Sequence, residues 1–204
     1  MSTKVFSFKT IESIGESEYK DRGSKFLGIC VEVESRDDIK NELKRIKELH
    51  PKANHHCYAW RLGTEGVDFR TSDNGEPSGS AGRPIIRQID SAGVTNVLVV
   101  VIRYFGGTLL GIPGLVKAYK TAAEECLANT SIISKDVCKS VNITFSYPQM
   151  DDIMKLIKKL NIQILEEEMS LFCMYKLNIP LEHVSFFLEK IERLEGAAVV
   201  EEKK

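Results

Sequence analysis

Two glycine-rich segments carry the residues of this chain that are best suited to chemistry. The first runs from Ser72 to Pro84 and holds two carboxylates, Asp73 and Glu76, three residues apart. Paired carboxylates act as general acid and base or hold a divalent metal, and an Asp in such a segment equally well satisfies the amides of a turn. Because a metal site needs more acidic ligands than this segment offers, we expect no metal.

The second segment runs from Arg103 to Tyr119, between an apolar run and an alanine-rich run. Amides at the start of a helix bind anions, so one interpretation is a contact with a phosphate or carboxylate. The other is that the glycines only permit a tight turn and close packing. Gly106 and Gly111 have Walker spacing, but Ile112-Pro113 stands where Lys-Ser/Thr is required, so we expect no nucleotide cofactor and no other cofactor.

We expect the two segments to form one surface built from backbone amides and a few charges. The predicted binding residues lie within or beside them and are Lys25, Arg83, Arg103, Tyr104, Gly106, Gly107, Gly111, Gly114 and Lys117. In this hypothesis the cations contact phosphates, and Tyr58, Trp60 and Tyr104 stack on nucleobases. The alternative for aromatic residues within strands is packing in the core.

His55 and Cys57 alternate along a predicted strand and therefore face the same side. Two such residues do not make a zinc site without two further ligands. They form a Cys–His nucleophile pair in one hypothesis and part of a half-buried polar strand in the other. With Asp73 and Glu76 they complete the set of catalytic candidates, and the sequence leaves open whether the chain is an enzyme.

The bulk composition narrows the class of protein. The 204 residues are 43% hydrophobic and 28% charged, as in ordinary globular proteins, and suffice for one large or two small domains. A net charge of −1 argues against a strongly basic nucleic-acid binder, although it permits a local basic patch. No run approaches the ~20 apolar residues of a membrane span. Five scattered cysteines without a CxxC motif, and no signal-peptide pattern, predict a cytoplasmic protein without a membrane partner.

Alternating strand and helix patterns position these residues in the first part of the chain. Strands are predicted at residues 25–33, 55–61, 66–71 and 94–103, and the last of these contains the most hydrophobic run. Helices are predicted at residues 35–50, 84–92 and 114–129. The first helix begins with a capping box from Ser35 to Asp38.

The remainder of the chain predicts a β-α-β-β-α-β order, which is that of a ferredoxin-like domain. Its strands are expected at residues 137–146, 162–168, 171–179 and 197–201. One helix opens at Pro148, and a second lies between Leu181 and Gly196. We place a boundary in the short polar stretch 131–136 and predict domains of residues 1–134 and 135–204.

Four segments resemble the IMPACT family, in its YigZ-like bacterial branch. They are Ser24–Gly28, His55–Ala59, Asp73–Gly82 and Arg103–Tyr119. Asn74, Pro113 and Lys117 depart from the family pattern, and Asn74 removes a charge that a metal site would use. The resemblance implies an α/β (α+β) protein of two domains. The first is similar to ribosomal-protein and elongation-factor domains, and the second to the last domain of the translocating elongation factor.

The second glycine-rich segment, the nearby aromatic residues and the resemblance of both domains to translation-factor domains lead us to expect a cytoplasmic protein that contacts RNA or the ribosome and modulates translation. One alternative is an enzyme of hydrolase or phosphotransfer type, with Asp73 or Glu76 as acid/base, His55 or Cys57 assisting, and the loop amides as an anion hole. Another is a protein–protein adaptor that offers the ferredoxin-like sheet to a partner.

Overall fold

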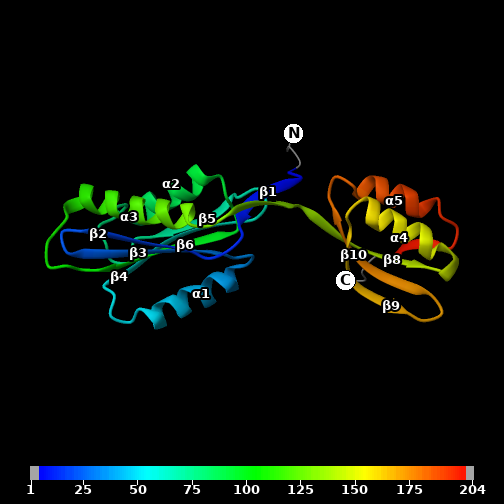
Figure 1. Ribbon diagram of the computed structural model, residues 1–204, viewed down its shortest axis with the longest axis horizontal. Coiled ribbons are helices and arrows are strands. Elements are labelled where there is room, and N and C mark those ends of the chain that lie inside the picture. The colour runs from blue at the N-terminus through cyan, green and yellow to red at the C-terminus, as the bar shows by residue number, and fades with distance from the viewer. Residues whose placement is uncertain (1–4, 201–204) are drawn as a thin grey trace. The chain divides into compact units, whose positions relative to one another are not determined.

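The computed structural model describes residues 5–200 and divides the chain into two compact units. One unit comprises residues 8–135, and the other comprises residues 136–200 together with residues 5–7. Both units combine sheets and helices, so the fold is of the mixed α/β (α+β) class that the sequence predicted (Figure 1). Among the described residues, no helix has both the length and the apolar character needed to cross a membrane.

A five-stranded antiparallel sheet forms the centre of the first unit. Its strand order is β2 (Gly15–Asp21), β3 (Ser24–Glu32), β6 (Val97–Tyr104), β4 (His55–Leu62) and β5 (Asp68–Ser72). The side chains from Val97 to Ile102 are completely buried, which explains why this hydrophobic run occupies the central strand.

Helices cover both faces of this sheet (Figure 1). Helix α1 (Arg36–Leu49) packs on one face through Ile39 and Ile46, and the predicted capping box of Ser35 and Asp38 is present at its start. Helices α2 (Gly82–Ala92) and α3 (Gly111–Ala128) pack on the other face. Each face of the sheet therefore has its own hydrophobic core, one under α1 and one under α2 and α3. Alternate side chains of β6 enter these two cores, because successive side chains of a strand point to opposite faces.

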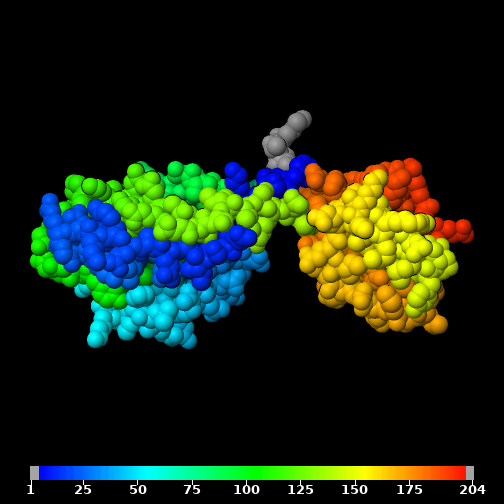
Figure 2. Space-filling view, viewed as in Figure 1, coloured from blue at the N-terminus to red at the C-terminus, as the bar shows by residue number. Residues whose placement is uncertain are grey.

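Helix α3 lies against β2 and β3 at very short range, and Figure 2 shows it (green to yellow-green) alongside the blue β2 strand. A Cβ atom on Gly28 would lie 2.4 Å from the carbonyl oxygen of Ala122 in α3. The hydroxyl of Ser17 donates a hydrogen bond of 2.7 Å to the same oxygen. Glycine at position 28 is therefore a packing requirement of the helix–sheet contact.

Three strands of the described region were not predicted. They are β1 (Ser7–Ile11), β2 and β7 (Ile132–Asp136), and β1 pairs with β7 in a separate two-stranded sheet. β2 is an edge strand whose exposed positions are polar, so it lacks the apolar pattern of a buried strand. The stretch that we interpreted as a polar boundary is β7, whose side chains are exposed or only half-buried.

The second unit has the predicted βαββαβ order. It comprises β8 (Cys138–Phe145), a 3-10 turn (Tyr147–Gln149), α4 (Met150–Lys159), β9 (Gln163–Met169), β10 (Cys173–Pro180), α5 (Val184–Glu192) and β11 (Ala197–Val200). The antiparallel sheet has the order β11-β8-β10-β9, and both helices share one core with it. The ferredoxin-like topology is thus confirmed.

Candidate functional site

The two glycine-rich segments meet on the face of the first sheet that α2 and α3 cover. Residues 73–81 lead from β5 into α2, and residues 105–110 lead from β6 into α3. With the start of β4 they border an open cavity of about 450 Å³, here called the loop cavity. It is lined by Asn54, His55, Glu76, Pro77, Arg103, Phe105, Leu109, Leu110, Gly111, Ile112 and Leu115.

A buried ion pair joins the two segments at this cavity. Nη1 of Arg103 donates a hydrogen bond of 2.7 Å to Oε1 of Glu76, and the hydroxyl of Tyr119 in α3 donates one of 2.8 Å to the same oxygen. The Arg103 guanidinium lies 5.4 Å from the ring centroids of Phe26 and of Phe105. The carboxylate of Glu76 is therefore held by its neighbours, as a buried charge must be.

The Tyr119 hydroxyl remains protonated in this arrangement. Burial raises the pKa of Tyr119 far above its ordinary value, and the nearby Cys57 and Glu76 raise it further. Tyr119 is consequently a permanent hydrogen-bond donor to Glu76 and has no capacity as a base at neutral pH.

His55 stands at the edge of the site and contacts the first segment. Its Nδ1 lies 2.8 Å from the carbonyl oxygen of Asn74, and its Nε2 lies 3.9 Å from Oε1 of Glu76. Because a carbonyl oxygen only accepts hydrogen bonds, Nδ1 is the donor in the contact with Asn74.

Cys57 lies behind the cavity lining and does not reach the cavity itself. Its thiol donates hydrogen bonds to the carbonyl oxygen of Asp73 at 2.9 Å and to the hydroxyl of Tyr119 at 3.3 Å. Burial raises the pKa of Cys57 to about 12, so the nucleophilic thiolate is scarce at neutral pH. These hydrogen bonds and the raised pKa argue against the hypothesis of a Cys57–His55 nucleophile pair.

Asp73 organises the first segment. Its Oδ2 accepts a hydrogen bond of 2.8 Å from the amide of Gly79, and its Oδ1 accepts bonds of 3.0 and 2.8 Å from the amides of Ala81 and Gly82 at the start of α2. Burial alone would raise the pKa of Asp73, but these amide hydrogen bonds outweigh it and hold the pKa below its ordinary value. Of the roles left open by the sequence, the structure supports that of satisfying turn amides.

The predicted stacking aromatics do not join Arg103. Arg103 and Tyr104 are adjacent in β6 and face opposite sides of the sheet. Tyr104 packs toward α1, where its hydroxyl lies 2.9 Å from Nδ1 of His50. Tyr58 and Trp60 belong to the same α1-side cluster. One surface cannot hold both the guanidinium and these rings, so the predicted combination is wrong.

The predicted phosphate-binding cations are also scattered. The ammonium group of Lys25 lies 2.5 Å from a carboxylate oxygen of Glu18 in β2. Arg83 and Lys117 are exposed on α2 and α3 and do not line the loop cavity. Arg103 alone lines it, with its charge paired to Glu76 rather than presented at the surface.

The predicted binding glycines have different roles: one is required by a close backbone contact, and another lines the loop cavity. A Cβ atom on Gly106 would lie only 1.9 Å from the carbonyl carbon of Gly23, so the turn between β2 and β3 requires glycine there. Gly111 begins α3 and lines the cavity, whereas Gly107 and Gly114 do not.

Sequence reasoning missed the apolar residues of the cavity. Phe105, Leu109 and Ile112 line it and are exposed. Their signal was present in the sequence, because large apolar side chains stand among the glycines of this segment. Charged residues and glycines alone do not indicate these apolar side chains.

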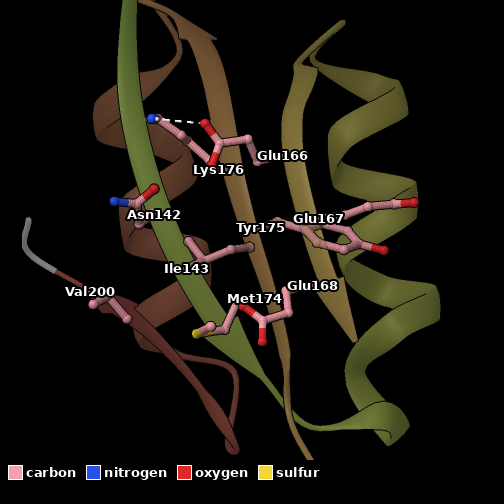
Figure 3. Close-up of a pocket in the computed structure, with 9 residues that line it drawn as sticks. All are labelled: Asn142, Ile143, Glu166, Glu167, Glu168, Met174, Tyr175, Lys176 and Val200. Atoms are coloured by element: carbon pink, nitrogen blue, oxygen red, sulfur yellow. Dashed lines mark hydrogen bonds and ion pairs between the residues drawn. The ribbon is translucent and has the colours of Figure 1, made fainter. Parts of the chain in front are cut away.

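The second unit carries a larger hollow of about 640 Å³ on its sheet (Figure 3). Lys176 of β10 pairs there with Glu166 of β9 at 3.1 Å, and Glu167 and Tyr175 lie on the side of α4. This hollow is an open sheet face whose charges are partly paired. In residues 5–200, no group of three or more His, Cys, Asp or Glu side chains is placed to hold a metal ion.

Known proteins similar to this chain point to one family. The Impact N-terminal domain matches residues 22–127. The IMPACT family member YigZ of Escherichia coli K12 is 30% identical over 170 residues, which cover 82% of this chain and 83% of YigZ. The protein IMPACT homolog of Saccharomyces cerevisiae is 32% identical over 118 residues, covering 56% of this chain and 45% of the yeast protein.

The crystal structure of a hypothetical protein is also similar, with 26% identity and a TM-score of 0.73 over 97% of this chain and 99% of the other. The region matched by the domain family contains all four segments that carried the resemblance. This chain belongs to the IMPACT family.

Proposed function

We propose that this chain regulates translation by binding a protein of the translation machinery through the loop cavity. The observation that carries the proposal is the division of roles within the site. Glu76, Arg103 and Tyr119 are engaged with one another, while the apolar side chains of Phe105, Leu109 and Ile112 are exposed around the same cavity. Exposed apolar side chains gathered at a cavity are typical of binding surfaces.

The site gives little support to the enzyme alternative. A general acid or base must be free to exchange a proton with a substrate, and a nucleophilic thiol must ionise. Asp73 is occupied by three amides, and the thiol of Cys57 is buried and protonated. These observations favour binding over catalysis.

The translational part of the proposal rests on family membership, because the resemblance implies translation regulation for eukaryotic members. Of the two constituents of a ribosome, we favour protein over RNA as the contact. RNA binding needs several cations on one surface. Here Lys25 is paired with Glu18, Arg103 is paired with Glu76, and the predicted aromatics lie on the other face.

Sedimentation of a cell lysate through a sucrose gradient tests the proposal. We expect the wild-type protein to travel with ribosomal particles or with a protein complex that persists after nuclease treatment. Leu109→Ser should release it, and Leu171→Ser is a matched control, since these leucines are 82% and 88% exposed and Leu171 lies outside the cavity. The proposal fails if the protein stays at the top of the gradient, if nuclease alone releases it, or if both variants behave alike.

A further inference from the structure

Arg103 has donor capacity that the protein does not use. The residue is only 5% exposed and lines the loop cavity. Within residues 5–200, Nη1 donates to Glu76, and the buried Nε has no hydrogen-bond partner. Because Nε itself is closed off from solvent, an acceptor that enters the cavity would meet the remaining N–H groups of this guanidinium, which have no acceptor within the described residues.

The start of α3 lies at the same cavity. Its N-cap is Leu110, which has no side-chain acceptor, and no side chain caps this end. Pro113 has no N–H group, which leaves the amides of Gly111 and Ile112 as the donors of the first turn. In contrast, Asp73 already occupies the amides at the start of α2. Of α2 and α3, the start of α3 is therefore the one without a side-chain acceptor that an incoming anion would have to displace.

Apolar side chains complete the cavity between these two groups of donors. Phe105, Leu110 and Leu115 lie along its wall, and Leu109 and Ile112 extend into solvent. A volume of about 450 Å³ accommodates a side chain of Leu or Phe size together with the group that carries it.

We infer that the loop cavity binds a carboxylate attached to an apolar group, with the carboxylate between Arg103 and the start of α3 and the apolar group against Phe105, Leu110 and Leu115. The charge of Glu76 disfavours a phosphate dianion, whereas a planar monoanion matches the guanidinium. A peptide chain that ends in an apolar residue and a free apolar acid share this chemistry. This inference rests on the proposed function, because it assigns a ligand class to the same cavity.

Titration followed by amide NMR tests the inference with defined probes: N-acetyl-Ala-Ala-Leu, the same peptide with a C-terminal amide, and 4-methylpentanoate. We expect the acid peptide to shift the amide resonances of Gly111 and Ile112. The amidated peptide should bind about tenfold more weakly, because it loses charge-assisted hydrogen bonds. Tighter binding of the acid peptide than of 4-methylpentanoate identifies a chain terminus as the source, and equal binding identifies a free acid.

Two variants separate the contributions of the site. Arg103→Lys keeps a cation beside Glu76 but removes the planar donors, so it should weaken the acid peptide and leave the amide unchanged. Leu109→Asp introduces a carboxylate that repels the carboxylate of the ligand, so it should also weaken binding of the acid peptide. Leu171→Asp is the matched control. Equal binding of acid and amide, or binding of neither, overturns the inference. If ribosomal sedimentation still depends on Leu109 in that case, the proposed function stands without it.

Discussion

Glu76 and Arg103 are 27 residues apart in the chain, yet their side chains meet at 2.7 Å in a pair that solvent barely reaches. Each comes from one of the two glycine-rich segments. The pair therefore ties the segments together and fixes the cavity between them.

Breaking this pair from one side should be far worse than removing it altogether. Glu76→Ala leaves the Arg103 charge buried without compensation and should lower the free energy of unfolding by about 3–5 kcal/mol. The double variant Glu76→Ala, Arg103→Met should lose much less than the sum of the losses of Glu76→Ala and Arg103→Met made singly. Urea denaturation of the four proteins measures the coupling, and additive losses would show that the pair does not act as a unit.

Tyr119→Phe should destabilise the protein without disturbing the ring packing. It removes the hydroxyl that donates to Glu76 and accepts from Cys57, at a cost of about 1–3 kcal/mol. The ring contact with Phe26, at a centroid distance of 5.2 Å, stays in place. Thermal and urea unfolding give the loss, and Tyr147→Phe, an exposed tyrosine, provides the comparison. Equal stability of both variants would contradict the role of the hydroxyl.

Cys57 should resist alkylation in the folded protein. With its pKa raised to about 12, roughly one thiol in ten thousand is ionised near pH 8. Iodoacetamide followed by peptide mass spectrometry should label the exposed Cys138 first and Cys57 only after denaturation. Rapid labelling of Cys57 in the native state would restore it as a candidate nucleophile.

Asp73→Asn should destabilise the first unit in a pH-dependent way. The folded state lowers the pKa of Asp73, so its charge stabilises the protein above the ordinary value of 3.8 and ceases to do so as the pH falls through the lower folded value. Near neutral pH we expect a loss of about 1–3 kcal/mol, which shrinks in acid.

The control for that experiment is Asp37→Asn. Asp37 forms an exposed pair with Lys40, and such pairs contribute at most about 1 kcal/mol. Unfolding free energies of both variants are measured across the acid range. If the loss of unfolding free energy in Asp73→Asn did not depend on pH, the effect would come from the changed geometry of the side chain and not from its charge.

Much of the fold follows from apolar periodicity. The central strand β6, the capped helix α1 and the whole βαββαβ unit have patterns that only one type of element satisfies. β1, β2 and β7 escaped prediction because they are short or carry polar residues on exposed edges, where pairing with a neighbouring strand, rather than burial, makes the strand.

The site was predictable in its location but not in its chemistry. Glycine content identified both segments, whereas the partner of each charge depends on contacts between distant residues. The pairing of Arg103 with Glu76 and the capture of Asp73 by three amides are examples. Neighbours in sequence were also misleading, since Arg103 and Tyr104 serve different faces of the sheet.

That alternation makes β6 intolerant of changes in length. Deleting one residue between Val97 and Ile102 would shift the residues that follow it by one position and turn each of their side chains to the opposite face of the sheet. Tyr104 would then enter the loop cavity, and Arg103 would face α1 without Glu76. A substitution in this strand changes the contacts of one side chain. Deletion of a single codon would disrupt both the loop cavity and the core under α1.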